Sequence, residues 1–176
     1  MLRKFYKMHG IGNDYIYFDC LDTPLENPEA AALKLSDRHF GIGGDGIVLI
    51  ENSAVADAKM RIFNKDGTEG LAGGNAIRCV GKYLYEKGIV LSRDMRIETA
   101  SGVKEVRVYS FNGKVNSASV NLGKAELAGK KIPCVWNEDK IVNKPVKIGG
   151  QDRQSALRRI QRESGRGGRG NGRTSL

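Results

Sequence analysis

The sequence predicts an α+β fold in which many short strands surround one well-defined helix. Segments rich in aromatic and β-branched residues recur over residues 1–150, and glycine-containing turns separate them. Only residues 75–86 place apolar side chains at a sustained helical spacing, and strands do not alternate regularly with helices as they do in βαβ folds. A chain of 176 residues with 40% hydrophobic residues is long and apolar enough to bury a core.

The expected strands lie at residues 5–6, 15–18, 47–50, 59–64, 95–99, 103–109 and 114–122. Residues 59–64 alternate between polar and apolar side chains, as a half-buried strand does. Asp66-Gly67 predicts a turn, and Asn112-Gly113 predicts a hairpin turn between the last two strands.

Two helices are expected. Residues 28–35 form a short one, with Asn27 as the predicted N-cap and Pro28 at the first helical position. The longer helix covers residues 75–86 and ends before Gly88, a favourable C-terminal residue. Its apolar stripe consists of Ala76, Ile77, Val80, Tyr83 and Leu84.

The net charge of +9 divides the chain into two regions. Residues 1–150 carry 22 Lys and Arg against 18 Asp and Glu, whereas residues 151–176 carry 7 Arg against 2 acidic residues and contain no Lys. We therefore predict a folded region at 1–150 and a disordered Arg/Gly-rich tail at 151–176.

Cellular location is predicted from three absences. The longest aliphatic run is residues 47–50, too short for a membrane span, and residues 1–7 lack the apolar stretch of a secretory signal. The three cysteines (Cys20, Cys79 and Cys134) are odd in number and widely spaced, which favours a reducing, cytoplasmic setting.

The richest chemical signal is the glycine-dense segment 64–79, which leads into the long helix. Unpaired amides and the macrodipole make a helix N-terminus favourable for a carboxylate or phosphate, and Asn64 or Asn75 can add hydrogen bonds. The alternative is purely structural: Gly-Gly-Asn at 73–75 forms a strand-to-helix turn capped by Asn75. The spacing alone leaves both interpretations open.

Four segments together resemble one enzyme family. MHGIGND at 8–14, RHFGIGGDG at 38–46, RIFNKDGTE at 61–69 and GNAIRC at 74–79 resemble, in order and spacing, signature segments of the diaminopimelate epimerases. The resemblance covers residues 1–150 and implies a strand-rich lobe with a curved sheet, or β-roll, wrapped around a central helix.

The resemblance also implies a chemistry. The family inverts the α-carbon of LL-diaminopimelate to the meso form in lysine biosynthesis, as an isomerase without pyridoxal phosphate, metal or other cofactor. One cysteine thiolate removes the α-proton while a second thiol returns a proton from the opposite face. By position, Asn13, Asn64, Gly74 and Asn75 match the family's substrate-contacting residues.

Two departures lead us to expect a truncated and inactive form. Gly73 stands where the family has its first catalytic cysteine, and glycine has no group that can transfer a proton. The family's second lobe, with its own cysteine, has no counterpart in this sequence. Cys79 is expected to be a core residue, because it lies nearly two helical turns beyond position 73.

The other titratable candidates are predicted to be structural. His9 and His39 lack a Cys or His partner at metal-ligand spacing, so we predict no metal site. Asp14 and Glu69 are typical of loop-fixing carboxylates, and Cys20 and Cys134 are expected to be inert.

The tail leaves three interpretations open: RNA binding, an unselected sequence such as a shifted reading frame, or a solvated extension. The abrupt loss of Lys favours the second, and the absence of aromatic residues beside the arginines makes a nucleic-acid partner the weaker interpretation. The alternative function is a non-catalytic module whose Arg/Gly tail binds nucleic acid. No membrane partner is expected, and an exposed inter-lobe face can support self-association.

Overall fold

The computed structural model describes residues 3–71, 73–124, 126–132, 138–142, 145–148 and 151–154. They fall into two compact units, divided after Asn121. Among these residues, no helix is both long and apolar enough to cross a membrane.

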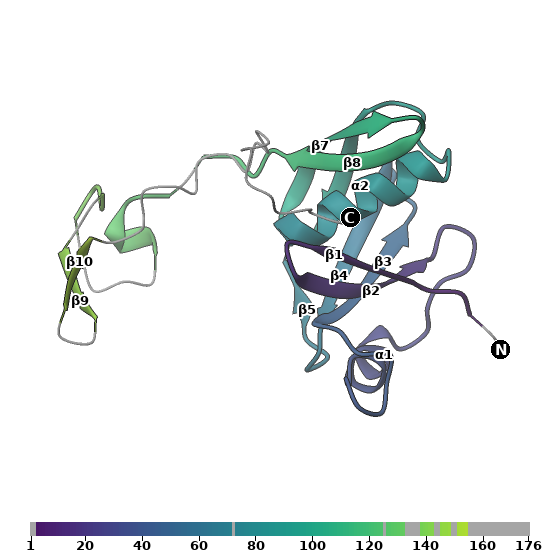
Figure 1. Ribbon diagram of the computed structural model, residues 1–176, viewed down its shortest axis with the longest axis horizontal. Coiled ribbons are helices and arrows are strands. Elements are labelled where there is room, and N and C mark those ends of the chain that lie inside the picture. Colours follow the sequence, from purple (N-terminus) through teal and green to yellow (C-terminus); the bar gives the residue numbers. More distant parts are fainter. Residues whose placement is uncertain are drawn as a thin grey trace. The chain divides into compact units, whose positions relative to one another are not determined.

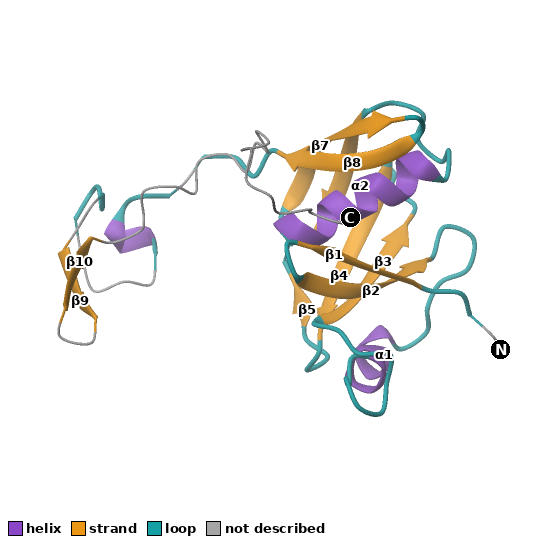
Figure 2. Ribbon diagram, in the orientation of Figure 1, coloured by secondary structure: helices purple, strands orange, loops and turns teal. Residues whose placement is uncertain are grey.

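The first unit is a curved sheet that surrounds helix α2 (Gly74–Glu86) (Figures 1 and 2). The strands follow the order β1-β2-β3-β4-β6-β7-β8, and the short β5 pairs with β4. Pairs β2–β3 and β4–β6 are parallel, and the other pairs are antiparallel. The strand bounds are β1 Tyr6–Gly10, β2 Asn13–Asp19, β3 Gly46–Glu51, β4 Ala58–Asn64, β5 Glu69–Gly70, β6 Asp94–Thr99, β7 Gly102–Phe111 and β8 Lys114–Val120.

Helix α2 contacts strands from both ends of the sheet: β1 and β2 on one side, β7 and β8 on the other. Its apolar stripe is buried, as the helical spacing predicts, and it packs with residues of the sheet's inner face. The second helix, α1 (Pro28–Leu35), packs against β3 and β4 and belongs to a separate core cluster on the other face.

Strand β3 explains why its sequence is apolar without alternation. Val48 and Ile50 belong to the α2 cluster, whereas Ile47 and Leu49 belong to the α1 cluster. Because both faces of β3 are buried, the strand has no solvent-facing side that would carry polar residues. Burial of each of these side chains contributes about 1.5–3 kcal/mol to the stability of the fold. Strand β3 therefore holds the loops at its two ends in place.

The predicted elements of this unit are confirmed, but the short strand β5 was not predicted, and β1 and the start of α1 differ from expectation. The first strand is longer than residues 5–6, because β1 continues to Gly10 and turns into β2 through Ile11 and Gly12, both with positive φ. Asn27 occupies the N-cap position of α1 in a left-handed conformation, and its side chain makes no capping hydrogen bond. Pro28 begins the helix as predicted.

The second unit contains the 3-10 turn η1 (Gly129–Lys131) and an antiparallel pair, β9 (Pro145–Ile148) and β10 (Gln151–Gln154). Ile141 is buried in this unit, and the Ile141 amide donates to the Leu127 carbonyl oxygen. The boundary that the sequence predicts after residue 150 falls between these two paired strands. The predicted disordered tail of residues 151–176 begins with strand β10, whereas its residues 155–176, and Cys134, lie outside the described ones.

Candidate functional site

The N-terminus of α2 is built without a side-chain cap. Gly73 is the N-cap residue, in an extended conformation with φ −137° and ψ 105°, and its carbonyl oxygen accepts from the Ile77 amide at 2.9 Å. Asn75 lies inside the first turn, so the alternative of a turn capped by Asn75 is wrong. No acidic side chain stands in this turn, and the first amides of the helix remain directed at the space before it.

Asn75 meets Asn13 across the fold. The Asn75 Nδ2 donates to the Asn13 Oδ1 at 3.4 Å, which joins the start of α2 to the start of β2. Gly10 permits this approach, because a Cβ there would lie 3.0 Å from the Asn75 carbonyl oxygen. The structure thus brings together Asn13, Gly74 and Asn75, which the family resemblance singles out.

A cluster of charged side chains contacts Asn13 and its neighbour Asp14. The Asn13 Nδ2 donates to the Asp45 Oδ2 at 2.7 Å, and Arg38 donates to both Asp45 and Asp14 at 2.9 and 2.6 Å. Lys7 forms an ion pair with Asp14. The Arg38 hydrogen bond, followed by that of Lys7, lowers the pKa of the Asp14 carboxyl well below its ordinary value. Asp14 therefore stays ionised and fixes this loop, as predicted.

Asn64 is attached to the same region through Asp45. It ends β4 opposite Gly46, and its Nδ2 donates to the Thr68 Oγ1 at 3.0 Å. The amide of Lys65, the next residue, donates to the Asp45 carbonyl oxygen at 3.1 Å. The three asparagines are all partly buried, and Asp45 is the residue that links Asn13 to the Asn64 region.

Position 73 supplies no acid or base, and neither described cysteine replaces it. Cys79 is fully buried in the core beneath α2, as predicted, and burial raises the pKa of its thiol. Cys20 is also buried, and burial raises its thiol pKa as well. Neither residue has the environment of a reactive thiolate, which requires partial exposure and a lowered pKa.

The remaining titratable candidates make structural contacts. Glu69 accepts two hydrogen bonds from Arg61, at 2.7 and 2.9 Å, which tie β5 to β4. His9 Nδ1 accepts from the Gly12 amide at 3.4 Å inside the β1–β2 turn, and the His39 amide donates to Asp37. In the part of the chain that the structure describes, no group of His, Cys, Asp and Glu forms a metal site.

Sequence reasoning missed Arg78 and Asp45. Arg78 is only 9% exposed, and its Nη2 donates to the Asn75 Oδ1 at 2.8 Å. The sequence did contain a signal for Arg78: it is a charged residue between Ile77 and Cys79, in a part of the helix that is predicted to be buried. A buried cation requires a hydrogen-bond or ion-pair partner. Asp45 carried no such signal, because an aspartate in a glycine loop is common.

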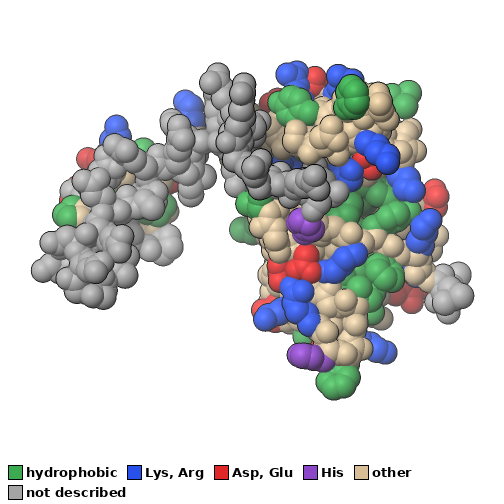
Figure 3. All heavy atoms as spheres, in the orientation of Figure 1, with side chains coloured by type: hydrophobic (Ala, Val, Ile, Leu, Met, Phe, Trp, Pro, Cys, Tyr) green, Lys and Arg blue, Asp and Glu red, His purple; other side chains and the backbone are tan. Residues whose placement is uncertain are grey.

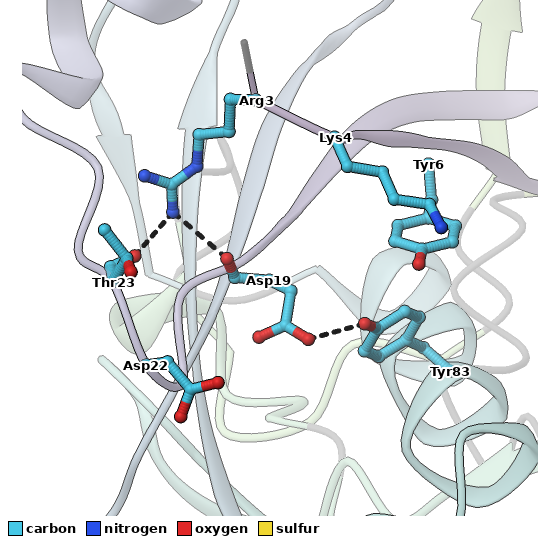
Figure 4. Close-up of a pocket in the computed structure, with 7 residues that line it drawn as sticks. All are labelled: Arg3, Lys4, Tyr6, Asp19, Asp22, Thr23 and Tyr83. Atoms are coloured by element: carbon cyan, nitrogen blue, oxygen red, sulfur yellow. Dashed lines mark hydrogen bonds between the residues drawn. The ribbon is translucent and has the colours of Figure 1, made fainter. Parts of the chain in front are cut away.

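A separate cavity of about 340 Å³ lies elsewhere in the first unit (Figure 4). Its lining residues are Arg3, Lys4, Tyr6, Asp19, Asp22, Thr23 and Tyr83. The polar groups are largely committed to one another: Arg3 donates to the Asp19 and Thr23 carbonyl oxygens, and the Tyr83 hydroxyl donates to the Asp19 carboxylate at 2.6 Å. Burial, followed by the Asp19 hydrogen bond, raises the pKa of Tyr83, which keeps the phenol a neutral donor.

On the visible face of the first unit, acidic and basic side chains are interspersed and form no field of one sign (Figure 3). The Asn13–Asn75 region, which combines uncapped helix amides with two asparagine side chains, is the candidate site.

Known proteins are similar to this chain over most of its length. Residues 5–128 match the family model for diaminopimelate epimerase. The diaminopimelate epimerase of Acetivibrio thermocellus is 46% identical over 149 residues, which cover 85% of this chain and 53% of that protein. The diaminopimelate epimerase of Methanococcus maripaludis is 46% identical over 143 residues, covering 81% and 52%. The chain thus spans about half the length of these curated relatives.

Solved structures share the fold at low sequence identity. A phenazine biosynthesis protein of the PhzF family from Bacillus anthracis aligns with a TM-score of 0.50 and 20% identity, over 66% of this chain and 38% of that one. A methylitaconate-delta-isomerase aligns with a TM-score of 0.51 and 18% identity, over 74% and 38%. These similarities support the curved sheet around α2 as a fold and carry no functional conclusion.

Proposed function

Since this chain belongs to the diaminopimelate epimerase family, we propose that it binds diaminopimelate between the start of α2 and the first residue of β2. Asn13, Asn64, Gly74 and Asn75 are the proposed contacts. The observation that carries the proposal is the hydrogen bond between Asn75 and Asn13, which places two amide side chains beside uncapped helix amides.

The proposed site suits a substrate α-carboxylate. Backbone N–H groups and the positive end of the helix dipole favour an anion at the start of α2. Asn75 adds an amide donor there, and Asn13 and Asn64 add groups that both donate and accept, as an α-amino acid requires. No carboxylate in the first turn of α2 competes for this position.

We propose further that this chain binds diaminopimelate but that position 73 does not take part in inverting its α-carbon. Removal of an α-proton needs a base within hydrogen-bond reach, and Gly73 has no side chain to provide one. The buried thiol of Cys79 has a raised pKa and belongs to the core cluster, so it does not substitute.

Calorimetric titration with diaminopimelate tests the first part. We expect saturable binding that weakens at least about tenfold in Asn75→Ala, because one charge-assisted hydrogen bond contributes roughly 1.5–3 kcal/mol. Asn116→Ala is the matched control, since Asn116 is an exposed asparagine on β8. No heat of binding at millimolar ligand, or equal affinity in Asn75→Ala, contradicts the proposal.

Proton NMR in deuterated water tests the second part. We expect no exchange of the substrate α-proton over hours with the unmodified chain. Deuterium incorporation at the α-carbon would show that another group of this chain acts as the base.

A further inference from the structure

Three hydrogen bonds at the site run in one direction. The Arg78 Nη2 donates to the Asn75 Oδ1 at 2.8 Å, the Asn75 Nδ2 donates to the Asn13 Oδ1 at 3.4 Å, and the Asn13 Nδ2 donates to the Asp45 Oδ2 at 2.7 Å. The chain of bonds begins at a guanidinium and ends at a carboxylate, with two amides between them.

The two charged ends decide this direction. A guanidinium has only donors and an ionised carboxylate has only acceptors, whereas a primary amide carries one group of each kind. Rotating the Asn13 amide by 180° would place its oxygen against the Asp45 carboxylate. The same rotation of Asn75 would place its NH2 group against Arg78. Both rotated arrangements replace a charge-assisted hydrogen bond with repulsion.

From this polarity we infer that Asp45 and Arg78 are positioning residues that fix the amide orientations of Asn13 and Asn75 for the ligand. The inference rests on the proposed function for its ligand. The Asn75 NH2 group keeps a second N–H, which suits the substrate carboxylate, and the Asn13 oxygen keeps a second lone pair, which suits the substrate ammonium.

Asp45 is itself held from several sides. Its Oδ1 accepts from Arg38 at 2.9 Å, and its Oδ2 also accepts from the Asp14 amide at 3.2 Å. Its own amide donates to the Asp14 carbonyl oxygen at 2.7 Å. These contacts fix the carboxylate before any ligand arrives, so its effect on Asn13 does not depend on binding.

Arg78 is held by burial. It is 9% exposed in the middle of α2, between core residues Ile77 and Cys79. A cation at this depth has few alternative positions, and its hydrogen bond to Asn75 three residues earlier spans less than one helical turn.

Side-chain amide NMR provides a test that does not depend on the ligand. In the unmodified chain we expect one set of 15N–1H signals for the Asn13 and Asn75 side chains, with slow exchange of the bonded protons. Asp45→Asn and Arg78→Gln each replace a charged end with an amide that both donates and accepts. We expect the Asn13 signals to shift and broaden in Asp45→Asn, and those of Asn75 in Arg78→Gln.

Conservative and control variants separate orientation from folding. In Arg78→Lys the side chain still ends in a group that only donates hydrogen bonds. We therefore expect this variant to preserve the Asn75 signals that Arg78→Gln disturbs. Asp94→Asn and Arg107→Gln, which break an exposed ion pair between β6 and β7, are matched controls and should leave both asparagines unchanged. If Arg78→Gln does not fold, Asp45→Asn still decides whether a charged end orients Asn13, since Asp45 is half exposed.

Calorimetry with diaminopimelate adds the functional measurement. We expect the Kd to rise about tenfold in Asp45→Asn, the effect of losing about 1.4 kcal/mol, and to stay within about threefold in Arg78→Lys. If the unmodified chain binds no diaminopimelate, the proposed function fails while the NMR result still decides the positioning role. A folded Asp45→Asn variant with unchanged Asn13 signals would overturn the inference.

Discussion

Gly73 lies directly against Ile62: a Cβ on Gly73 would be 3.0 Å from the Ile62 Cδ1 and 3.3 Å from the Ala76 Cβ. The Gly73 backbone is extended, a conformation that every L-residue adopts readily. Because the closest atom is the end of a flexible side chain, a small shift of Ile62 makes room. The backbone at position 73 therefore does not require glycine.

Gly73→Cys should fold and produce a reactive thiol. The free energy of unfolding should change by less than about 1 kcal/mol, because reduced freedom of the unfolded chain offsets the contact with Ile62. At a helix N-terminus the thiol pKa should fall below its usual value of about 8.5. Alkylation rates across pH, followed by mass spectrometry, measure this.

The buried cysteines provide the internal control for that experiment. Cys20 and Cys79 should remain unmodified in the folded chain, because both are buried and burial raises the pKa of each thiol. If the new thiol of the Gly73→Cys variant has a pKa at or above that of a free thiol, the expected effect of the helix terminus is contradicted.

Gly46→Ala should be severely destabilising. A Cβ on Gly46 would lie 2.0 Å from the Phe63 carbonyl oxygen, a backbone atom of the paired strand β4. Separating the two strands should cost at least about 3 kcal/mol. Gly88→Ala is the comparison, since Gly88 has a φ of +69° and open space around it; its cost should be about 1 kcal/mol. Urea unfolding measures both, and equal losses would contradict the clash.

Asp14→Asn should reduce stability in a pH-dependent way. Arg38, followed by Lys7, lowers the pKa of the Asp14 carboxyl below its ordinary 3.8. The stabilisation is therefore complete above pH 3.8 and is lost as the pH falls from there toward the lowered value. At pH 7 the variant should lose about 1–2 kcal/mol.

Urea unfolding at pH 7, 5 and 3 checks this prediction. The difference between Asp14→Asn and the unmodified chain should persist at pH 5 and shrink at pH 3. Asp94→Asn should have the smaller effect at pH 7, because its ion pair with Arg107 is exposed to solvent and screened. A difference that is the same at all three pH values would exclude Asp14 ionisation as the cause.

Thr68→Val should weaken ligand binding through Asn64. The Thr68 hydroxyl accepts from the Asn64 Nδ2 at 3.0 Å and donates to the Asp66 Oδ1 at 2.6 Å. Valine keeps the shape and removes both bonds, so the Asn64 amide becomes free to rotate. We expect the Kd for diaminopimelate to rise about fivefold, equivalent to roughly 1 kcal/mol. Ser117→Ala, an exposed substitution on β8, should leave the Kd unchanged in the same titration.

Local patterns were sufficient for most elements of the first unit. The helical spacing of α2 and the continuous apolar run of β3 each reflect burial that the sequence encodes directly. The extension of β1 to Gly10 was missed because the alternation of Tyr6 and Met8 with polar Lys7 and His9 is only four residues long and ends at a glycine. The pairing of β9 with β10 was also missed, since each strand has only four residues and β10 consists entirely of polar ones.

The sequence by itself determined the family, the order of the elements and the fact that position 73 has no proton-transferring side chain. Only the tertiary structure decided that Asn75 meets Asn13, 62 residues away, and that Asn13 meets Asp45, 32 residues away. The physical reason is that these contacts depend on the curvature of the sheet and the packing of α2 against both of its ends. Periodicity reports which face of an element is buried, and it contains no information about which distant polar groups that burial brings within hydrogen-bond distance.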